Sequence, residues 1–243
     1  MADSAVEPVS IDCPIRVPQP VLRQSWLEVT FLHWSFDPAL VRPLIPAGLE
    51  LDLWEGKCFV GLVPFILADI TLARAPAAPW LSRFNETNVR TYVFDRHGRR
   101  GVWFFSLDAA RLAAVIGARI SYALPYYWAR MEVHRDGPQV RYRSKRRHGP
   151  QGKTYIVVTP GTAIVEPSPL EIFLTARWRL FACRSDRLFR ADIDHPRWPL
   201  QQATVNTMEE SLLRAAGLPE PAGAPLAHFS SGVSVMTGWP QPI

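Results

Sequence analysis

Short apolar or alternating segments, separated by turn-forming residues, run through most of the chain. Residues 49–54 alternate apolar and polar positions, as in a half-buried strand, and residues 58–70 are more continuously apolar. Pro64 interrupts the second segment and is expected at a bulge or an edge, because proline cannot donate to a strand ladder. The predicted strands cover residues 26–34, 49–54, 58–70, 88–95, 101–107, 130–135, 138–143, 154–159, 177–184, 188–194 and 232–237.

Turn and capping residues predict how these strands connect. Asp136-Gly137 and the segment 185–187 mark tight hairpins, and a glycine-containing turn joins strands 88–95 and 101–107. Short helices are predicted where an N-capping side chain precedes a helical pattern, including one over residues 109–116 and one that ends at Gly217. The predicted capping residues are Asp37, Asp108, Ser168 and Thr207, the last two in capping boxes.

Hairpin-connected strands with a few short helices predict a mainly antiparallel α+β protein. The sheet is expected to be large and closed or nearly closed, with helices packed on it and room for a ligand cavity inside a wide barrel. Residues 1–20 contain four prolines and no periodicity, which predicts a loose or surface-draped arm. Residues 21–243 are interpreted as a single domain.

Composition indicates the cellular compartment of the protein but does not indicate its reaction. The chain has 243 residues and a net charge of +5, and only three of its 27 basic side chains are lysines. Arginine binds carboxylates in a planar, bidentate manner, which weakly favours an anionic ligand. Three widely spaced cysteines predict neither disulfides nor a metal site, and no apolar run is long enough for a membrane. The first ten residues lack a secretion signal, so a cytoplasmic protein is expected.

The densest basic run, residues 141–148, admits two interpretations. It could bind nucleic-acid phosphates, in which case binding would weaken steeply with salt. Arg141, Arg143 and Lys145 alternate, however, and alternation favours the solvated face of a strand. Nucleic acid is therefore an unlikely partner, and a homo-oligomer is compatible with the sequence.

Two segments carry candidate chemistry. Residues 84–90 gather Glu86, Asn88 and Arg90 at a strand entrance, where a cavity-facing Glu86 would have a raised pKa suited to proton transfer. The pattern alone slightly favours the alternative, a surface ion pair between Glu86 and Arg90. His33 lies on a predicted strand and could face the cavity. No histidine has a partner at metal-ligand spacing, and no hydrolase triad or cofactor motif occurs.

The second segment, residues 117–131, surrounds Pro125 with polar-tipped aromatic side chains and arginines. Such side chains suit an internal pocket for a small anion. The candidates in this segment are Arg119, Tyr122, Tyr126, Tyr127 and Arg130.

Together these segments resemble acetoacetate decarboxylase and its relatives. More closely, the chain resembles a sister family in that superfamily, the YqjF-like bacterial proteins. The matching motifs are Phe31-Leu-His-Trp34, Val63-Pro-Phe65, Asn88-Val-Arg-Thr-Tyr-Val93, Trp103-Phe-Phe-Ser-Leu-Asp108 and Leu124-Pro-Tyr-Tyr-x-Ala-Arg-Met131. The resemblance implies a cone-shaped β barrel with an internal cavity and a cavity glutamate at Glu86.

One departure from the decarboxylase changes the expected chemistry. The resemblance implies two lysines after the matching proline, the first of which forms a Schiff base, but this chain has Tyr126 and Tyr127 there. A phenol cannot form an imine, so the Schiff-base mechanism is lost at this site. The remaining hypothesis is a non-covalent enzyme for a small carboxylate or carbonyl compound. Glu86 would be the acid/base, a tyrosine the proton donor, and Arg90, Arg119 or Arg130 the carboxylate ligand, with Tyr122, His33 and Asn88 lining the site. The alternative is a non-catalytic binder of the same ligand.

Overall fold

The computed structural model describes residues 5–73, 82–112 and 122–243. Within these residues the fold is dominated by thirteen strands in one sheet. The strands are β1 (Leu22–Phe36), β2 (Leu49–Leu51), β3 (Cys58–Leu72), β4 (Phe84–Asp95), β5 (Arg100–Ala109), β6 (Tyr126–Asp136), β7 (Gln139–Arg146), β8 (Lys153–Ala163), β9 (Arg179–Arg184), β10 (Arg187–Asp194), β11 (Leu200–Glu210), β12 (Leu226–Thr237) and β13 (Gln241–Pro242).

The helices in the described residues are short, and none is long and apolar enough to cross a membrane. They are α1 (Pro38–Val41), the 3₁₀ helix η1 (Arg42–Leu44), α3 (Pro169–Thr175) and α4 (Leu212–Ala215). Helix α1 begins as predicted, because the Asp37 side chain accepts a hydrogen bond from the Ala39 amide. Helix α3 also begins as predicted, with both hydrogen bonds of the capping box between Ser168 and Glu171.

Two additional pairings close the sheet on itself. The strand order is β13-β10-β9-β5-β6-β7-β8-β11-β12-β1-β3-β4-β2, and β4 also pairs with β5 while β10 also pairs with β12. The β4–β5 pairing closes a nine-stranded barrel. The β10–β12 pairing closes a smaller ring through β9, β5, β4, β3 and β1. Strands β12, β1, β3, β4 and β5 belong to both rings, so their two faces look into different interiors. The predicted mainly antiparallel barrel is confirmed, and only β5–β6 and β5–β9 are parallel among the described pairs.

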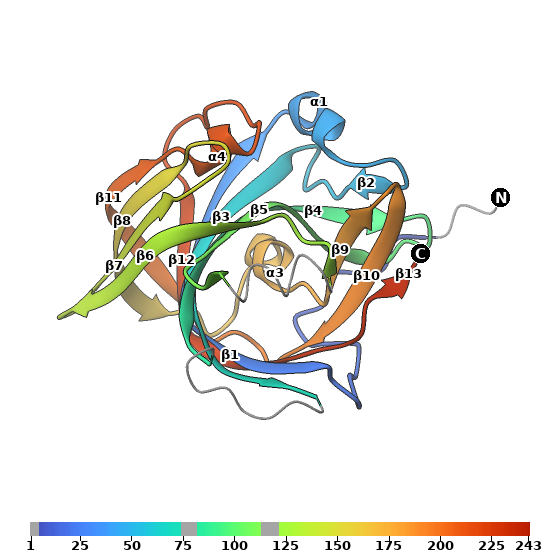
Figure 1. Cartoon of the computed structure of the whole chain (residues 1–243), viewed down its shortest axis with the longest axis horizontal. Coiled ribbons are helices and arrows are strands. Elements are labelled where there is room, and N and C mark those ends of the chain that lie inside the picture. Colours follow the sequence, from blue (N-terminus) through green and yellow to red (C-terminus); the bar gives the residue numbers. More distant parts are fainter. Residues whose placement is uncertain (1–4, 74–81, 113–121) are drawn as a thin grey trace.

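Helix α3 lies inside the smaller ring, surrounded by β1, β3, β9 and β10 (Figure 1). Its buried Phe173 and Leu174 pack with Tyr92 of β4 and with Ile193 of β10. Alternation along the shared strands then separates two cores. Val89 of β4 packs into the larger barrel, whereas Tyr92 contacts the helix side. Side chains on the helix side of β4 therefore face an interior that is closed by α3.

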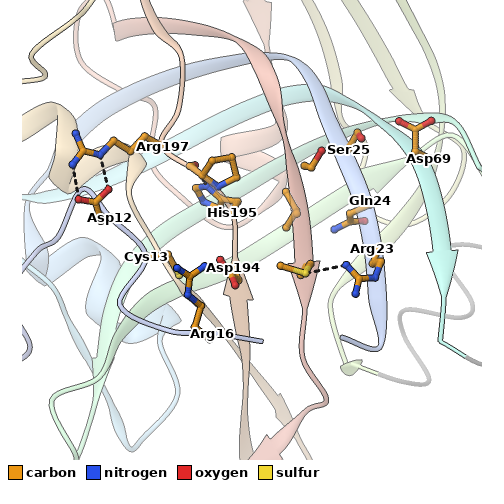
Figure 2. Close-up of a pocket in the computed structure, with 14 residues that line it drawn as sticks. Asp12, Cys13, Arg16, Arg23, Gln24, Ser25, Asp69, Asp194, His195 and Arg197 are labelled. Carbon is orange, nitrogen blue, oxygen red and sulfur yellow. Dashed lines mark hydrogen bonds and ion pairs between the residues drawn. The ribbon is translucent and has the colours of Figure 1, made fainter. Parts of the chain in front are cut away.

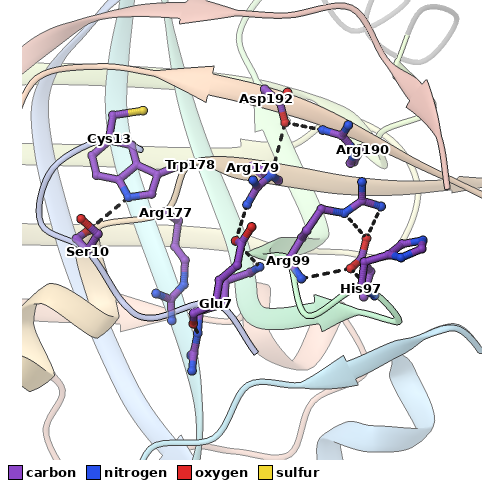
Figure 3. A network of polar contacts seen from close by, with 12 residues as sticks. Glu7, Ser10, Cys13, His97, Arg99, Arg177, Trp178, Arg179, Arg190 and Asp192 are labelled. Carbon is purple, nitrogen blue, oxygen red and sulfur yellow. Dashed lines mark hydrogen bonds and ion pairs between the residues drawn. The ribbon is translucent and has the colours of Figure 1, made fainter. Parts of the chain in front are cut away.

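Residues 5–20 run along the outside of the strands before β1 begins. Glu7 accepts a hydrogen bond from Arg179 Nη1 at 2.6 Å, and its amide donates to the Gly98 carbonyl at 2.9 Å. Trp178 Nε1 donates to the Ser10 carbonyl at 3.1 Å (Figure 3). These contacts hold this part of the N-terminal segment against β9 and the turn after β4.

Three local predictions meet different outcomes in the sheet. Pro64 lies opposite the register shift between Leu27 and Leu32 in the β1–β3 ladder, so the predicted bulge is confirmed. The Asp108 cap is wrong, because β5 continues to Ala109 and Asp108 is fully buried in the sheet. Residues 113–116 of the predicted helix 109–116 lie outside the described residues. The Thr207 capping box is also wrong, because residues 207–210 pair with β8 as part of β11. In both errors, strand pairing overrides a local capping pattern.

Candidate functional site

Strand β4 carries a row of buried polar side chains on its helix-facing side. Glu86, Asn88 and Arg90 are 3%, 4% and 8% exposed. They occupy alternate positions of one strand, so their side chains point to the same face. The surface ion pair between Glu86 and Arg90 is therefore wrong: both residues are buried, and Arg90 makes no ion pair within the described part of the chain.

Sheet register brings Tyr126 to Glu86. Asn88 pairs with Leu107, and Leu107 pairs with Tyr126 across the parallel β5–β6 contact. From that position the Tyr126 ring reaches diagonally, and its hydroxyl donates a hydrogen bond to Glu86 Oε2 at 2.8 Å. The two residues that the resemblance placed together therefore do contact each other.

Burial controls the protonation of this pair. Desolvation raises the pKa of Glu86 from 4.5 to about 8, against the opposing effect of hydrogen bonds from Tyr126 and Asn88. Burial, together with the neighbouring Glu86 carboxylate, raises the pKa of Tyr126 well above 10. At neutral pH Glu86 is therefore mostly a protonated acid beside a protonated phenol. Near pH 8 Glu86 can release its proton. Tyr126 and Asn88 then remain as hydrogen-bond donors that stabilise the Glu86 carboxylate.

Among the described residues, no carboxylate pairs with the buried guanidinium of Arg90. Its guanidinium lies 5.6 Å from the Phe31 ring and 5.9 Å from the Tyr92 ring. Its Nε and Nη2 atoms are both buried without a hydrogen-bond partner. These two atoms form the edge with which arginine grips a carboxylate. The same edge of Arg146 holds Asp108, with Nε at 2.9 Å and Nη2 at 2.8 Å from Oδ1.

A glycine separates Arg90 from a buried histidine. His33 pairs with Gly61 across β1–β3, and Gly61 pairs with Arg90 across β3–β4. A Cβ at Gly61 would lie 2.9 Å from His33 Nε2 and 3.6 Å from Arg90 Cγ. A larger residue at position 61 would therefore crowd the His33 ring, whereas its contact with Arg90 would be ordinary. Burial, with Arg90 nearby, lowers the pKa of His33 well below 6.5, so the ring is neutral.

Tyr127 points away from Glu86. It follows Tyr126 on β6 and pairs with Asp108, on the opposite face of the sheet. The Arg146 guanidinium lies 4.1 Å from its ring and is ion-paired with Asp108. Burial raises the pKa of Asp108 to about 6, although Arg146 opposes that rise. The charges of this second buried cluster are paired with each other, and it lies behind the row on β4.

The other predicted residues are dispersed. The Arg130 side chain is 75% exposed and pairs with Glu132 at 3.4 Å. Tyr122 is half-buried, and its hydroxyl donates to the Gly238 carbonyl at 3.2 Å. Arg119 lies outside the described residues. On β7, Arg143 and Lys145 are exposed and alternate with the buried Tyr142, as predicted for a solvated strand face.

Two surface pockets lie near this interior but are not lined by the row on β4. The first, of about 720 Å³, opens between the N-terminal segment and β1, with His195 on its wall (Figure 2). The His195 ring is 4.9 Å from the Trp198 ring, which in turn is 5.1 Å from the Phe31 ring beside Arg90. The second pocket, of about 660 Å³, lies along β6 and β7, where Arg141 and Arg143 contribute to its lining.

Comparison with known proteins places the chain in a family. A family of uncharacterized conserved proteins, DUF2071, matches residues 23–234. The chain belongs to the DUF2071 family. Within it, the chain is 35% identical over 222 residues to the uncharacterized protein YqjF of Bacillus subtilis, covering 90% of this chain and 91% of YqjF. The resemblance to YqjF-like proteins is thus confirmed.

Solved structures share the fold of this DUF2071 chain at low identity. The enduracididine biosynthesis enzyme MppR, complexed with pyruvate, superimposes with a TM-score of 0.67 at 14% identity, covering 98% of both chains. An acetoacetate decarboxylase-like enzyme from Sphingomonas wittichii gives a TM-score of 0.62 at 16% identity, covering 95% of this chain and 98% of that one. The acetoacetate decarboxylase of Legionella pneumophila gives 0.61 at 15% identity, covering 100% and 98%. At these identities the likeness establishes the acetoacetate decarboxylase-like fold alone.

None of the lysine amines of this DUF2071 chain is buried. Its three lysines, Lys57, Lys145 and Lys153, are all exposed. A Schiff base requires an uncharged amine, which proteins obtain by burying a lysine or placing it beside another cation. None of the three lies on the helix-facing side of β4.

Sequence reasoning missed three residues that complete this interior. Tyr92 continues the alternation on β4, and its hydroxyl donates to the Leu174 carbonyl of α3 at 2.5 Å. Phe31 lies under Arg90, and His228 pairs with Phe31 across β1–β12. Extending the period of two from Glu86 to residue 92 would have identified Tyr92. Phe31 and His228 come from other strands, and no local pattern distinguishes them.

Proposed function

We propose that this protein is a non-covalent acid–base enzyme for a small oxo or hydroxy carboxylic acid. Arg90 binds the carboxylate of the ligand, and Glu86 transfers a proton at the reacting end. The observation that carries the proposal is the buried, unpaired Nε–Nη2 edge of Arg90, on the same strand face as a protonated Glu86. A buried guanidinium without an anion is costly, and an anionic ligand would remove that cost.

The spacing along β4 limits how a ligand could lie. Glu86 and Arg90 are four positions apart, which is about 13 Å along an extended strand at roughly 3.3 Å per residue. Asn88 lies midway on the same face. A ligand that is held at Arg90 therefore extends past Asn88 toward Glu86, within the combined reach of the two long side chains.

Glu86 has the properties of a general acid. A pKa of about 8 leaves it mostly protonated at neutral pH and still able to lose its proton. After transfer, the carboxylate would accept hydrogen bonds from Tyr126 and Asn88, which stabilise the charged form. Tyr126 remains protonated throughout and acts as a donor rather than as a base. The cycle requires only that the product return a proton to Glu86.

Two further observations support the proposed ligand and mechanism. MppR, which shares the fold, has been solved in complex with pyruvate, so a protein of this fold can bind a small oxo acid. The exposed positions of all three lysines favour a mechanism without an imine. The acid–base proposal uses only groups that lie on the helix-facing side of β4 or reach it from β6.

The test is to incubate the protein with a panel of small oxo and hydroxy acids and to monitor their turnover by NMR. Glu86→Gln should abolish turnover while leaving ligand binding measurable, because glutamine keeps an acceptor for Tyr126 and cannot release a proton. Arg90→Lys should weaken binding at least about 10-fold, because lysine cannot make the bidentate contact. Arg130→Gln, which removes a charge from the surface, should alter neither.

Each failure has a distinct meaning. Turnover that survives Glu86→Gln would refute the assigned acid. Saturable binding that depends on Arg90 without turnover of any compound would favour the alternative, a non-catalytic binding protein for the same acids. Binding that is unchanged by Arg90→Lys would refute the carboxylate site itself.

A further inference from the structure

The interior around Arg90 contains buried acceptors as well as the unpaired cation. His33 Nδ1, Asn88 Oδ1 and His228 Nδ1 are buried and have no hydrogen-bond partner. All three residues are at least nine-tenths buried. The acceptors come from β1, β4 and β12. An orphaned buried acceptor is uncommon in native proteins and requires a donor.

The hydrogen-bond network determines what His33 presents. The Tyr92 hydroxyl gives its proton to the Leu174 carbonyl at 2.5 Å, so its oxygen is free to accept. His33 Nε2 lies 2.6 Å from that oxygen and must therefore carry the ring proton. Because the His33 ring is neutral, its Nδ1 bears a lone pair with no donor facing it. This tautomer follows from the network.

Asn88 and His228 also present unpaired hydrogen-bond acceptors. The Asn88 amide group donates to Glu86, which leaves its carbonyl oxygen unpaired. His228 Nε2 lies 3.2 Å from Glu171 Oε1. Because a carboxylate can only accept a hydrogen bond, Nε2 carries the ring proton, and Nδ1 is left as an acceptor without a donor. Burial lowers the pKa of His228, so its ring is neutral as well.

These acceptors discriminate among acids of the same skeleton. A carboxylate satisfies the Arg90 edge but supplies no donor to His33 or Asn88. A keto oxygen would add another acceptor and leave both lone pairs unpaired, whereas a hydroxyl group supplies a neutral donor. An ammonium group could also donate, but it would place a second cation beside Arg90, and the carboxyl group that contacts Asn88, Glu86, is mostly protonated at neutral pH.

We infer that the site prefers hydroxy acids to the corresponding oxo and amino acids. The carboxylate lies on the Nε–Nη2 edge of Arg90, and the hydroxyl donates to Asn88 Oδ1 or His33 Nδ1. The inference rests on the proposed use of Arg90 as the carboxylate ligand, and it adds the polarity of the second group. The rings of Phe31 and Tyr92 beside the guanidinium suit an aromatic or branched substituent.

The experiment compares matched triplets by calorimetry on the full-length protein. The probes are lactate, pyruvate and alanine, and phenyllactate, phenylpyruvate and phenylalanine. The hydroxy acid of each set should bind at least about 10-fold more tightly than the oxo acid, because the oxo acid leaves a buried acceptor unpaired. The amino acid should bind most weakly.

Variants test the hydrogen-bond acceptors and the carboxylate ligand separately. Asn88→Leu and His33→Phe remove one acceptor each, and at least one of them should bring the hydroxy-to-oxo affinity ratio close to one. Arg90→Lys should weaken all the acids together and preserve that ratio, and Arg130→Gln should change nothing.

The unmodified protein alone distinguishes the outcomes. Oxo acids that bind as tightly as hydroxy acids, or more tightly, would overturn this inference and leave the carboxylate site standing. Absence of binding by every acid would overturn both the inference and the proposed function. A variant that does not fold changes neither conclusion, because the affinity ratio is measured first in the unmodified protein.

Discussion

Replacing Glu86 by glutamine should make this protein more stable at alkaline pH. The substitution removes the ionisable group and keeps a side chain of nearly the same shape, with an acceptor for Tyr126. Burial raises the pKa of Glu86 from 4.5 to about 8, so the folded state disfavours the carboxylate that the unfolded chain forms freely. The stability that protonated Glu86 provides is therefore complete below pH 4.5 and is lost as the pH rises toward 8.

The magnitude follows from the two pKa values. Each tenfold change in the acid dissociation constant is worth about 1.4 kcal/mol, so a rise from 4.5 to about 8 corresponds to a total loss on the order of 5 kcal/mol. About 3 kcal/mol of this loss should already be present at pH 7. Domains of ordinary stability unfold with about 5–15 kcal/mol, so the effect is a substantial fraction of the whole.

The assay is guanidinium unfolding between pH 4.5 and 9, followed by fluorescence of the protein's nine tryptophans. The quantity of interest is the difference in unfolding free energy between Glu86→Gln and the unmodified protein. It should be smallest near pH 4.5 and grow by several kcal/mol up to about pH 8. Glu132→Gln, a change on a 57% exposed side chain, should give a flat difference. A flat difference for Glu86→Gln as well would refute the reasoning, since it would mean that Glu86 titrates equally in both states.

Three further predictions concern Tyr126, the Asp108–Arg146 pair and the lysines. Tyr126→Phe removes a hydrogen bond that lowers the pKa of Glu86, so that pKa should rise further and the alkaline limb of any activity profile should move to higher pH. Asp108→Asn leaves the buried Arg146 without its anion and should cost about 3–5 kcal/mol in unfolding experiments, whereas Asp108→Leu combined with Arg146→Met should cost much less. Borohydride added with acetoacetate or pyruvate should leave no reduced adduct on any lysine, and a mass increase on a lysine-containing peptide would contradict the non-covalent mechanism.

Local sequence signals predicted the elements that local chemistry controls. Both central residues of the turn between β9 and β10, Ser185 and Asp186, have positive φ values of 47° and 62°, and this hairpin was predicted from their sequence. The capping box at Ser168 formed a helix because that segment leaves the sheet and enters the ring. The same pattern at Thr207 formed a strand, because residues 207–210 complete the ladder with β8.

The candidate site was predicted in part. The match to a family with a cavity glutamate and a proline-following pair indicated Glu86 and Tyr126, and the structure places their oxygens 2.8 Å apart. Pattern alone gave the wrong partner for Arg90, because Glu86 at four residues' distance looks like a local ion pair. In a strand, that spacing puts both side chains on one face without bringing their ends together.

The residue types present at each position determine which reactions the chain can perform. With tyrosines at 126 and 127, the sequence leaves no amine at the position where the resemblance implies the imine-forming lysine. Which arginine lacks an anion was decided only by the tertiary structure. Arg146 is satisfied by Asp108, 38 residues away, while Arg90 faces rings and a glycine. The reason is physical: a charge is neutralised by whatever lies within a few ångströms, and in a closed sheet those neighbours come from distant parts of the chain.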